Sequence, residues 1–119
     1  MKKKIAILGS TGSIGKTLLD IIGKNKKNFE ISLLSTNKNY IALLKQAKLF
    51  NVKNLVIINK KSFEKFKKKN NNNKLNIYND FESLSKIFKK KIDYTMSSII
   101  GLDGLKPTLD IIKYTKKLL

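Results

Sequence analysis

Three glycines and three hydroxyl side chains lie within seven residues near the N-terminus, in the run Gly9-Ser10-Thr11-Gly12-Ser13-Ile14-Gly15. Glycines permit a tight turn and a close approach of the backbone to a ligand. The peptide N–H groups of such a turn donate hydrogen bonds to anions, and the hydroxyls of Ser10, Thr11 and Ser13 are further donors. We therefore expect this run to hold a phosphate group; an ordinary glycine turn is the alternative.

The segments on either side support the phosphate hypothesis. The apolar run before it, residues 5–8, is typical of a buried parallel strand, and residues 13–24 after it have apolar side chains at helical spacing. A dinucleotide-binding fold holds its pyrophosphate between the first strand and the first helix. The spacing G-x-T-G-x-x-G, which several reductase families use, therefore predicts a pyrophosphate site.

A second candidate group follows the expected strand 29–34. NAD enzymes place a carboxylate there to bind the ribose 2′-hydroxyl, but this chain has Ser35, Thr36, Asn37, Lys38 and Asn39. The cation of Lys38 would attract a 2′-phosphate, and no acid in the group would repel it. The group favours NADPH over NADH, although Lys38 is also explained as one more surface lysine.

A third candidate lies where the expected strand 94–100 ends. Ile99, Ile100 and Gly101 would flank the adenine or the nicotinamide of a dinucleotide, and a packed strand with a glycine turn explains them equally well. Asp103 is interpreted as a helix cap. With neither histidine nor cysteine in the chain, we assign no catalytic residue and no metal ligand.

Each of the three candidate groups follows an expected strand, so their placement depends on alternating strands and helices. Beyond the segments above, we expect strands at 55–58 and 75–78 and helices at 40–50, 60–69, 81–88 (Asp80 as N-cap) and 105–116 (Pro107 in the first turn). We expect residues 70–73 to form a loop, and residues 116–119 resemble the start of another strand. The pattern predicts a Rossmann-like doubly wound α/β fold, with a mainly parallel sheet and helices on both faces. We interpret residues 1–119 as one dinucleotide-binding domain.

The composition narrows the possible partners. The net charge of +18 comes from 26 basic residues, all lysine, against 8 acids. Such a charge is compatible with a basic nucleic-acid-binding module. The absence of arginine, which reads bases bidentately, favours a solvated lysine surface instead. No apolar run is long enough for a secretory signal or a membrane span, so we expect a cytoplasmic protein.

At three places the sequence resembles the 1-deoxy-D-xylulose 5-phosphate reductoisomerase family. Residues 4–15 are similar to the family's start almost residue for residue, and residues 17–22 continue the likeness. Lys38-Asn39 matches the Lys-Asn of the family's Gly-Lys-Asn cofactor loop, with Asn37 in place of the glycine. Residues 104–109 match the stretch that leads to the family's catalytic region. The resemblance covers the whole chain.

The resemblance implies an enzyme that converts 1-deoxy-D-xylulose 5-phosphate to 2-C-methyl-D-erythritol 4-phosphate in isoprenoid precursor synthesis. It implies NADPH and a divalent metal, Mg²⁺ or Mn²⁺, as cofactors, and a full-length homodimer is compatible with it. The implied NADPH contacts are Thr11, Gly12, Ser13, Ile14, Asn37, Lys38 and Asn39.

The family's Ala-Asn-Lys-Glu-Ser segment, its metal ligands, its sugar-phosphate site and its lid would all follow Leu119. We therefore expect this chain to be the N-terminal NADPH-binding part, without the catalytic and C-terminal domains and inactive alone. Another G-x-T-G-x-x-G reductase, such as a semialdehyde dehydrogenase-like enzyme, is the alternative.

Overall fold

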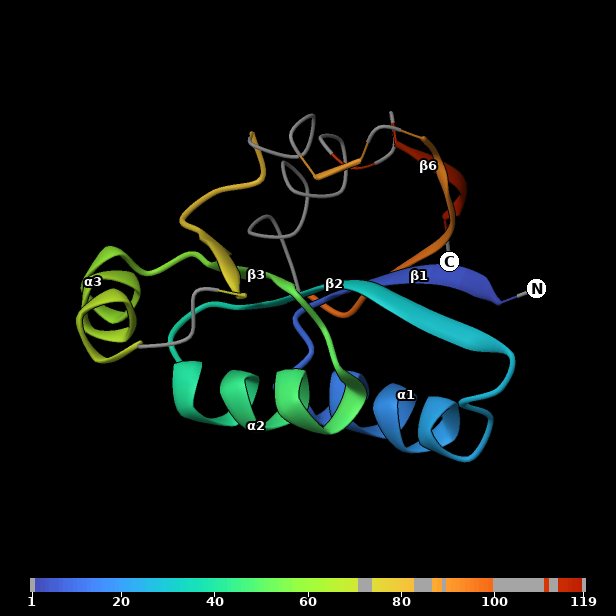
Figure 1. Ribbon diagram of the computed structural model, residues 1–119, viewed down its shortest axis with the longest axis horizontal. Coiled ribbons are helices and arrows are strands. Elements are labelled where there is room, and N and C mark those ends of the chain that lie inside the picture. Colours follow the sequence, from blue (N-terminus) through green and yellow to red (C-terminus); the bar gives the residue numbers. More distant parts are fainter. Residues whose placement is uncertain are drawn as a thin grey trace.

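The computed structural model describes residues 2–70, 74–82, 87–88, 90–99, 111 and 114–118. Strands and helices alternate through most of this part of the chain (Figure 1). The elements are β1 (Lys3–Leu8), α1 (Ser13–Gly23), β2 (Phe29–Thr36), α2 (Tyr40–Phe50), β3 (Asn54–Ile57), α3 (Lys60–Lys69), β4 (Asn76–Tyr78), β5 (Ile92–Ser97) and β6 (Thr115–Leu118).

All six of these strands form one parallel sheet in the order β4-β3-β2-β1-β5-β6. The chain runs outward from β1 to β4, then returns to place β5 on the other side of β1. The strand order therefore reverses between β1 and β5. In open α/β sheets a ligand crevice forms beyond the carboxyl ends of the strands at such a reversal, where β1 leads into residues 9–12 and β5 into Ser98.

The two faces of the sheet are covered by different parts of the chain. Ile5 and Ile7 of β1 belong to a core cluster that includes residues of α1, α2 and α3, whereas Ala6 and Leu8 belong to a second cluster with Phe81. In Figure 1, α1 and α2 lie together along one side of the sheet. Residues 5–8 are fully buried, which confirms the expectation of a strand covered on both faces.

A bulge in β2 sets the orientation of the residues that reach the crevice. Ile5 pairs with Ile31, but Ala6 pairs with Leu33, so Ser32 is an extra residue in the ladder. β2 then continues through Ser35 and Thr36, which are 1% and 3% exposed. The expected end of this strand at residue 34 was therefore two residues short, because Ser35 and Thr36 pair with Val56 and Ile57 of β3.

Helices α2 and α3 have the predicted bounds, and α1, β3 and β4 differ from prediction by one residue. The strand expected at 94–100 begins earlier and ends earlier, as β5 (Ile92–Ser97). The expected helix 105–116 is wrong at its end, because β6 starts at Thr115. A buried hydrogen bond of 2.6 Å joins the Thr115 and Thr95 hydroxyls and holds this edge strand on β5.

Several expectations fall on residues that the structure does not describe: residues 71–73 of the loop, 83–86 of the helix 81–88, and 100–110, which include Ile100, Gly101, Asp103 and Pro107. The side chain of Asp80 accepts a hydrogen bond from the Glu82 N–H at 3.0 Å, as an N-cap would. No helix in the described ranges combines the length and the apolar character that a membrane crossing requires.

Candidate functional site

The turn after β1 presents backbone N–H groups at the start of α1. Gly9 has φ +76°, a left-handed conformation that favours glycine, and Gly12 is the extended N-cap of α1. No side chain caps this helix, so the N–H groups of its first turn have no side-chain acceptor. An uncapped helix N-terminus on a glycine turn is a binding site for an anion.

Gly12 and Gly15 have opposite surroundings. A Cβ atom at Gly12 would meet only the Gly9 carbonyl oxygen, at 3.7 Å, so the space above it is open. A Cβ atom at Gly15 would lie 2.5 Å from the same oxygen and 2.6 Å from the Ser10 Cα. Gly15 is therefore required for packing the turn on the helix, whereas Gly12 leaves room for a ligand.

The structure corrects the expectation for the Ser10 hydroxyl. Ser10 is fully buried, and its Oγ donates to the Gln46 Oε1 at 2.8 Å and lies 3.2 Å from the Ser35 carbonyl oxygen. It therefore faces the protein and not a bound phosphate. The Thr11 and Thr36 hydroxyls are joined at 2.6 Å, whereas Ser13 is exposed.

The loop after β2 lies beside the turn. Asn37, Lys38 and Asn39 are exposed, and the N–H of Asn59 donates to the Asn37 carbonyl oxygen at 2.9 Å. Asn51 is the single described non-glycine residue with positive φ, so Asn37 replaces the family's glycine without a left-handed backbone. In the described part of the chain, Lys38 has no ion-pair partner, which leaves its cation available.

A cavity of about 660 Å³ joins these two groups. Its lining comes from the ends of four parallel strands and consists of Gly9, Thr11, Gly12, Ser35, Thr36, Asn37, Lys38, Asn39, Ile58, Ser98 and Ile99. Ser13 and Ile14 do not line it and lie on the first turn of α1. The lining contains no acid. It is therefore suited to a ligand with one negative group at the turn and another at the loop 37–39.

Sequence reasoning missed Ile58 and Ser98 as lining residues. Ile58 follows β3 and is 40% exposed although it extends an apolar run. Ser98 follows β5, and its Oγ donates to the carbonyl oxygens of Leu8 and Gly9, each at 2.8 Å. The carboxyl ends of neighbouring parallel strands meet at one edge, and this signal identifies both positions once the strand order is known.

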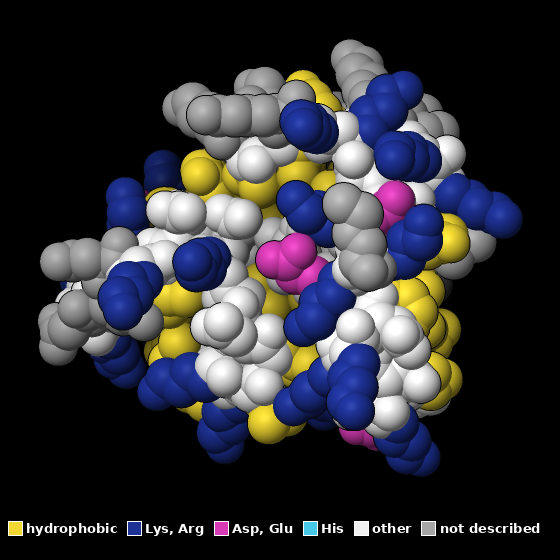
Figure 2. Space-filling view, turned by 45° about the vertical axis from the view of Figure 1, so that its right-hand side comes forward, with side chains coloured by type: hydrophobic (Ala, Val, Ile, Leu, Met, Phe, Trp, Pro, Cys, Tyr) yellow, Lys and Arg dark blue, Asp and Glu magenta, His cyan; other side chains and the backbone are white. Residues whose placement is uncertain are grey.

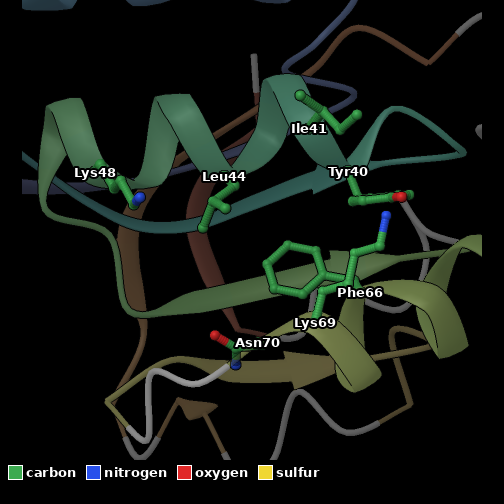
Figure 3. A pocket seen from close by; sticks show the side chains of 7 residues that line it. All are labelled: Tyr40, Ile41, Leu44, Lys48, Phe66, Lys69 and Asn70. Carbon is green, nitrogen blue, oxygen red and sulfur yellow. The ribbon is translucent and has the colours of Figure 1, made fainter.

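A second cavity of the same size lies between α2 and α3. Figure 3 shows Leu44 and Phe66 facing each other across it, with Tyr40 at one end and Lys48 and Asn70 towards the other. Its lining is mostly apolar and comes from helix sides, without a strand end or a glycine turn. It therefore lacks the backbone donors that a pyrophosphate requires.

Charge elsewhere on the molecule is widely distributed. On the face shown in Figure 2, lysine side chains are spread over the surface, with few acids among them. Asp93 lies near the start of β5, away from the cavity, and accepts from the Lys4 N–H at 2.8 Å. That hydrogen bond, with the nearby charges of Lys116 and Lys3, lowers the pKa of Asp93.

The described ranges contain no group of three histidine, cysteine, aspartate or glutamate side chains that could bind a metal. Asp103 and Asp110 lie outside the described residues.

Residues 5–119 match the family described as 1-deoxy-D-xylulose 5-phosphate reductoisomerase. A relative with that name from Pelagibacter ubique is 59% identical over 116 residues, which cover 96% of this chain and 30% of the relative. A reductoisomerase from Zymomonas mobilis, solved in complex with NADPH, superposes with a TM-score of 0.85 at 30% identity, covering 99% of this chain and 31% of that one.

A further reductoisomerase structure, with NADPH, fosmidomycin and magnesium, has a TM-score of 0.84 at 26% identity and covers 98% of this chain and 29% of its own. The chain thus spans about 30% of the length of the relatives it matches. The family match and the Rossmann-like sheet lead to one conclusion: the chain belongs to the 1-deoxy-D-xylulose 5-phosphate reductoisomerase family.

Proposed function

We propose that this chain binds NADPH in the cavity between the glycine turn and the loop 37–39. One observation carries the proposal. The cavity joins the uncapped N-terminus of α1 to Lys38, which has no acidic partner among the described residues. The helix N-terminus can bind the pyrophosphate of NADPH, and the lysine can bind its 2′-phosphate. The Zymomonas mobilis relative has been solved with NADPH on the same fold.

The pyrophosphate would lie on the turn, against the N–H groups of Thr11, Ser13 and Ile14. It would cover the open face of Gly12, whose own N–H donates to the Gly9 carbonyl oxygen at 3.3 Å. The 2′-phosphate would lie at Asn37, Lys38 and Asn39, where the Lys38 ammonium supplies the positive charge. Asn39 contributes through its backbone and its amide nitrogen, because its Oδ1 accepts from the Ala42 N–H at 3.2 Å and caps α2. The apolar side chains of Ile58 and Ile99 would flank the rings of the cofactor.

We propose the reaction of the whole enzyme from the membership of this chain in the reductoisomerase family. NADPH supplies the hydride that reduces the rearranged 1-deoxy-D-xylulose 5-phosphate to 2-C-methyl-D-erythritol 4-phosphate in isoprenoid precursor synthesis. The residues of this chain would bind and orient the cofactor. Catalysis, the Mg²⁺ or Mn²⁺ site and the sugar-phosphate site would belong to the catalytic and C-terminal domains of the family, outside these 119 residues. We also propose that the full-length enzyme is a homodimer in the cytoplasm. It would have no specific nucleic-acid partner.

Titration of the chain with NADPH and with NADH, followed by the fluorescence of the reduced nicotinamide, tests the proposal. We expect NADPH to bind about 10–100 times more tightly, because a charged hydrogen bond contributes about 1.5–3 kcal/mol. Equal or reversed affinities would reject the role of Lys38. We also expect no turnover of 1-deoxy-D-xylulose 5-phosphate by the 119 residues with NADPH and Mg²⁺.

A further inference from the structure

Gln46 forms two hydrogen bonds to one residue of the glycine turn. Its Nε2 donates to the Ser10 carbonyl oxygen at 2.9 Å, and its Oε1 accepts from the Ser10 Oγ at 2.8 Å. Gln46 is half-buried on α2, and it lies 36 residues from Ser10 in the sequence. Both polar atoms of the glutamine side chain are thus used to hold a single residue.

These bonds fix the orientation of a peptide group. In a trans peptide the carbonyl of one residue and the N–H of the next point in opposite directions, and the described residues contain no cis peptide. Because Gln46 holds the Ser10 carbonyl towards α2, the N–H of Thr11 must point away from α2. Within the described residues this N–H has no acceptor, and Thr11 lines the cavity.

The same helix begins directly after the loop proposed to hold the 2′-phosphate. α2 begins at Tyr40, directly after Lys38 and Asn39, and the Asn39 side chain caps it. Gln46 lies further along this helix and contacts the turn. α2 therefore connects the loop 37–39 to the turn through two hydrogen-bonded side chains, in addition to the direct bonds between the turn and the end of β2.

From this geometry we infer that Gln46 is a positioning residue for the pyrophosphate: it holds the Ser10 peptide so that the Thr11 N–H faces the bound anion. The inference rests on the proposed function and adds a residue that does not line the cavity. It predicts that Gln46 affects binding of the pyrophosphate and has little effect on the adenosine 2′-phosphate end.

The test compares two ligands on one variant. In Gln46→Leu we expect the Kd for NADPH to rise about tenfold, or about 1.4 kcal/mol, because the Thr11 N–H is no longer held towards the pyrophosphate. Adenosine 2′-monophosphate lacks the pyrophosphate, so its Kd should stay within about twofold of wild type. A role in overall stability alone would change the two Kd values in parallel, and that result would overturn the inference.

The matched control is Asn25→Leu, which also removes a side-chain amide. The Asn25 amide donates to the Ile21 carbonyl oxygen at the exposed end of α1. It should leave both Kd values unchanged. Ser10→Ala should weaken NADPH binding in the wild-type background and have less effect in Gln46→Leu, because the same contact is already lost. Full additivity of the two substitutions would contradict the inference.

A measurement without ligand separates this inference from the proposed function. Gln46→Leu should shift the amide resonances of Thr11 and Gly12 in the free protein, and Asn25→Leu should not. If wild type fails to bind NADPH, the proposed function is wrong, and the free-protein spectra still decide the role of Gln46. Unchanged Thr11 and Gly12 resonances would overturn it.

Discussion

The N-termini of α1 and α3 follow β1 and β3, the two strands on either side of β2, but they are built differently. Asn59 caps α3, with its Oδ1 accepting from the Ser62 N–H at 3.0 Å. At α1 the N-cap is Gly12, which has no side chain to accept from the helix. An asparagine cap stabilises a helix by about 1 kcal/mol relative to alanine, and it also occupies one of the N–H groups that an anion could use. The difference shows that α1 leaves its first turn open for a ligand.

Helix α2 combines features of both junctions. Asn39 caps it in the same way as Asn59 caps α3, yet the loop before it lines the cavity with Asn37 and Lys38. In the proposed site, its contribution would come from side chains and backbone ahead of the helix, and not from the helix N-terminus. The comparison predicts different effects for substitutions at the three junctions.

Gly12→Val should have the largest effect on binding. The valine side chain would extend into the open space at the turn and exclude the pyrophosphate, so we expect NADPH affinity to fall by about a hundredfold or more, or about 2.7 kcal/mol. The fold should persist, because a Cβ atom has room there. Fluorescence titration and thermal unfolding measure the two effects. Wild-type affinity in this variant would show that the pyrophosphate binds elsewhere.

Gly15→Ala is the control for this prediction. Its methyl group would collide with the Gly9 carbonyl oxygen and with backbone atoms of Ser10, so we expect a loss of about 1–3 kcal/mol in the free energy of unfolding. A stable Gly15→Ala protein would contradict the tight packing of the turn on α1.

Lys38→Glu should have the next largest effect, on cofactor preference. Replacing the cation by a carboxylate removes a charged hydrogen bond worth about 1.5–3 kcal/mol and repels the 2′-phosphate. We expect NADH to bind more tightly than NADPH in this variant. Lys60→Glu, a change of the same charge on the exposed surface of α3, is the control and should keep the NADPH preference. A retained preference in Lys38→Glu would place the 2′-phosphate elsewhere.

Asn39→Ala and Asn59→Ala test the difference between the two capped junctions. Each should lower the free energy of unfolding by about 1 kcal/mol, because each removes a helix cap. Only Asn39→Ala should also weaken NADPH binding, since only Asn39 follows Lys38 and lines the cavity. Chemical unfolding and titration of both variants provide the comparison. Equal losses of affinity would mean that capping, and not the position of the loop, controls binding.

Asp93→Asn should have the smallest effect, because Asp93 lies away from all three junctions. Its lowered pKa means that the folded state favours the ionised form. That stabilisation is present above the pKa of the unfolded chain and is lost as pH falls through the lower folded pKa. Wild type should therefore be slightly more stable than Asp93→Asn at neutral pH, and the difference should vanish in acid. A difference that persists below the folded pKa would contradict this assignment, as would a change in NADPH affinity.

Local patterns were sufficient to predict most of the fold. The uninterrupted apolar run at residues 5–8 indicated a buried strand, and the helices expected at 40–50 and 60–69 match α2 and α3. Thr115 was placed in the helix expected at 105–116. In the structure it pairs with Ile92 of β5, and a single sequence does not contain this information.

The site was only partly predictable for the same reason. The turn and the loop 37–39 follow adjacent strands, so their meeting at one edge could be anticipated. Ser10 has the same hydroxyl chemistry as Ser13, yet it points inward because Gln46, distant in sequence, provides a partner. The direction in which a turn residue points depends on packing against another helix, and residue type does not reveal it.

The most direct test of the cofactor site is an amide NMR titration of the chain with NADPH. If NADPH binds between the glycine turn and the loop 37–39, the largest shifts occur at Thr11, Gly12, Ser13 and Ile14, with a second group at residues 37–39. The cavity between α2 and α3, around Leu44 and Phe66, should show little change. Shifts concentrated in that cavity, or no shifts at the glycine turn with saturating NADPH, would contradict the account.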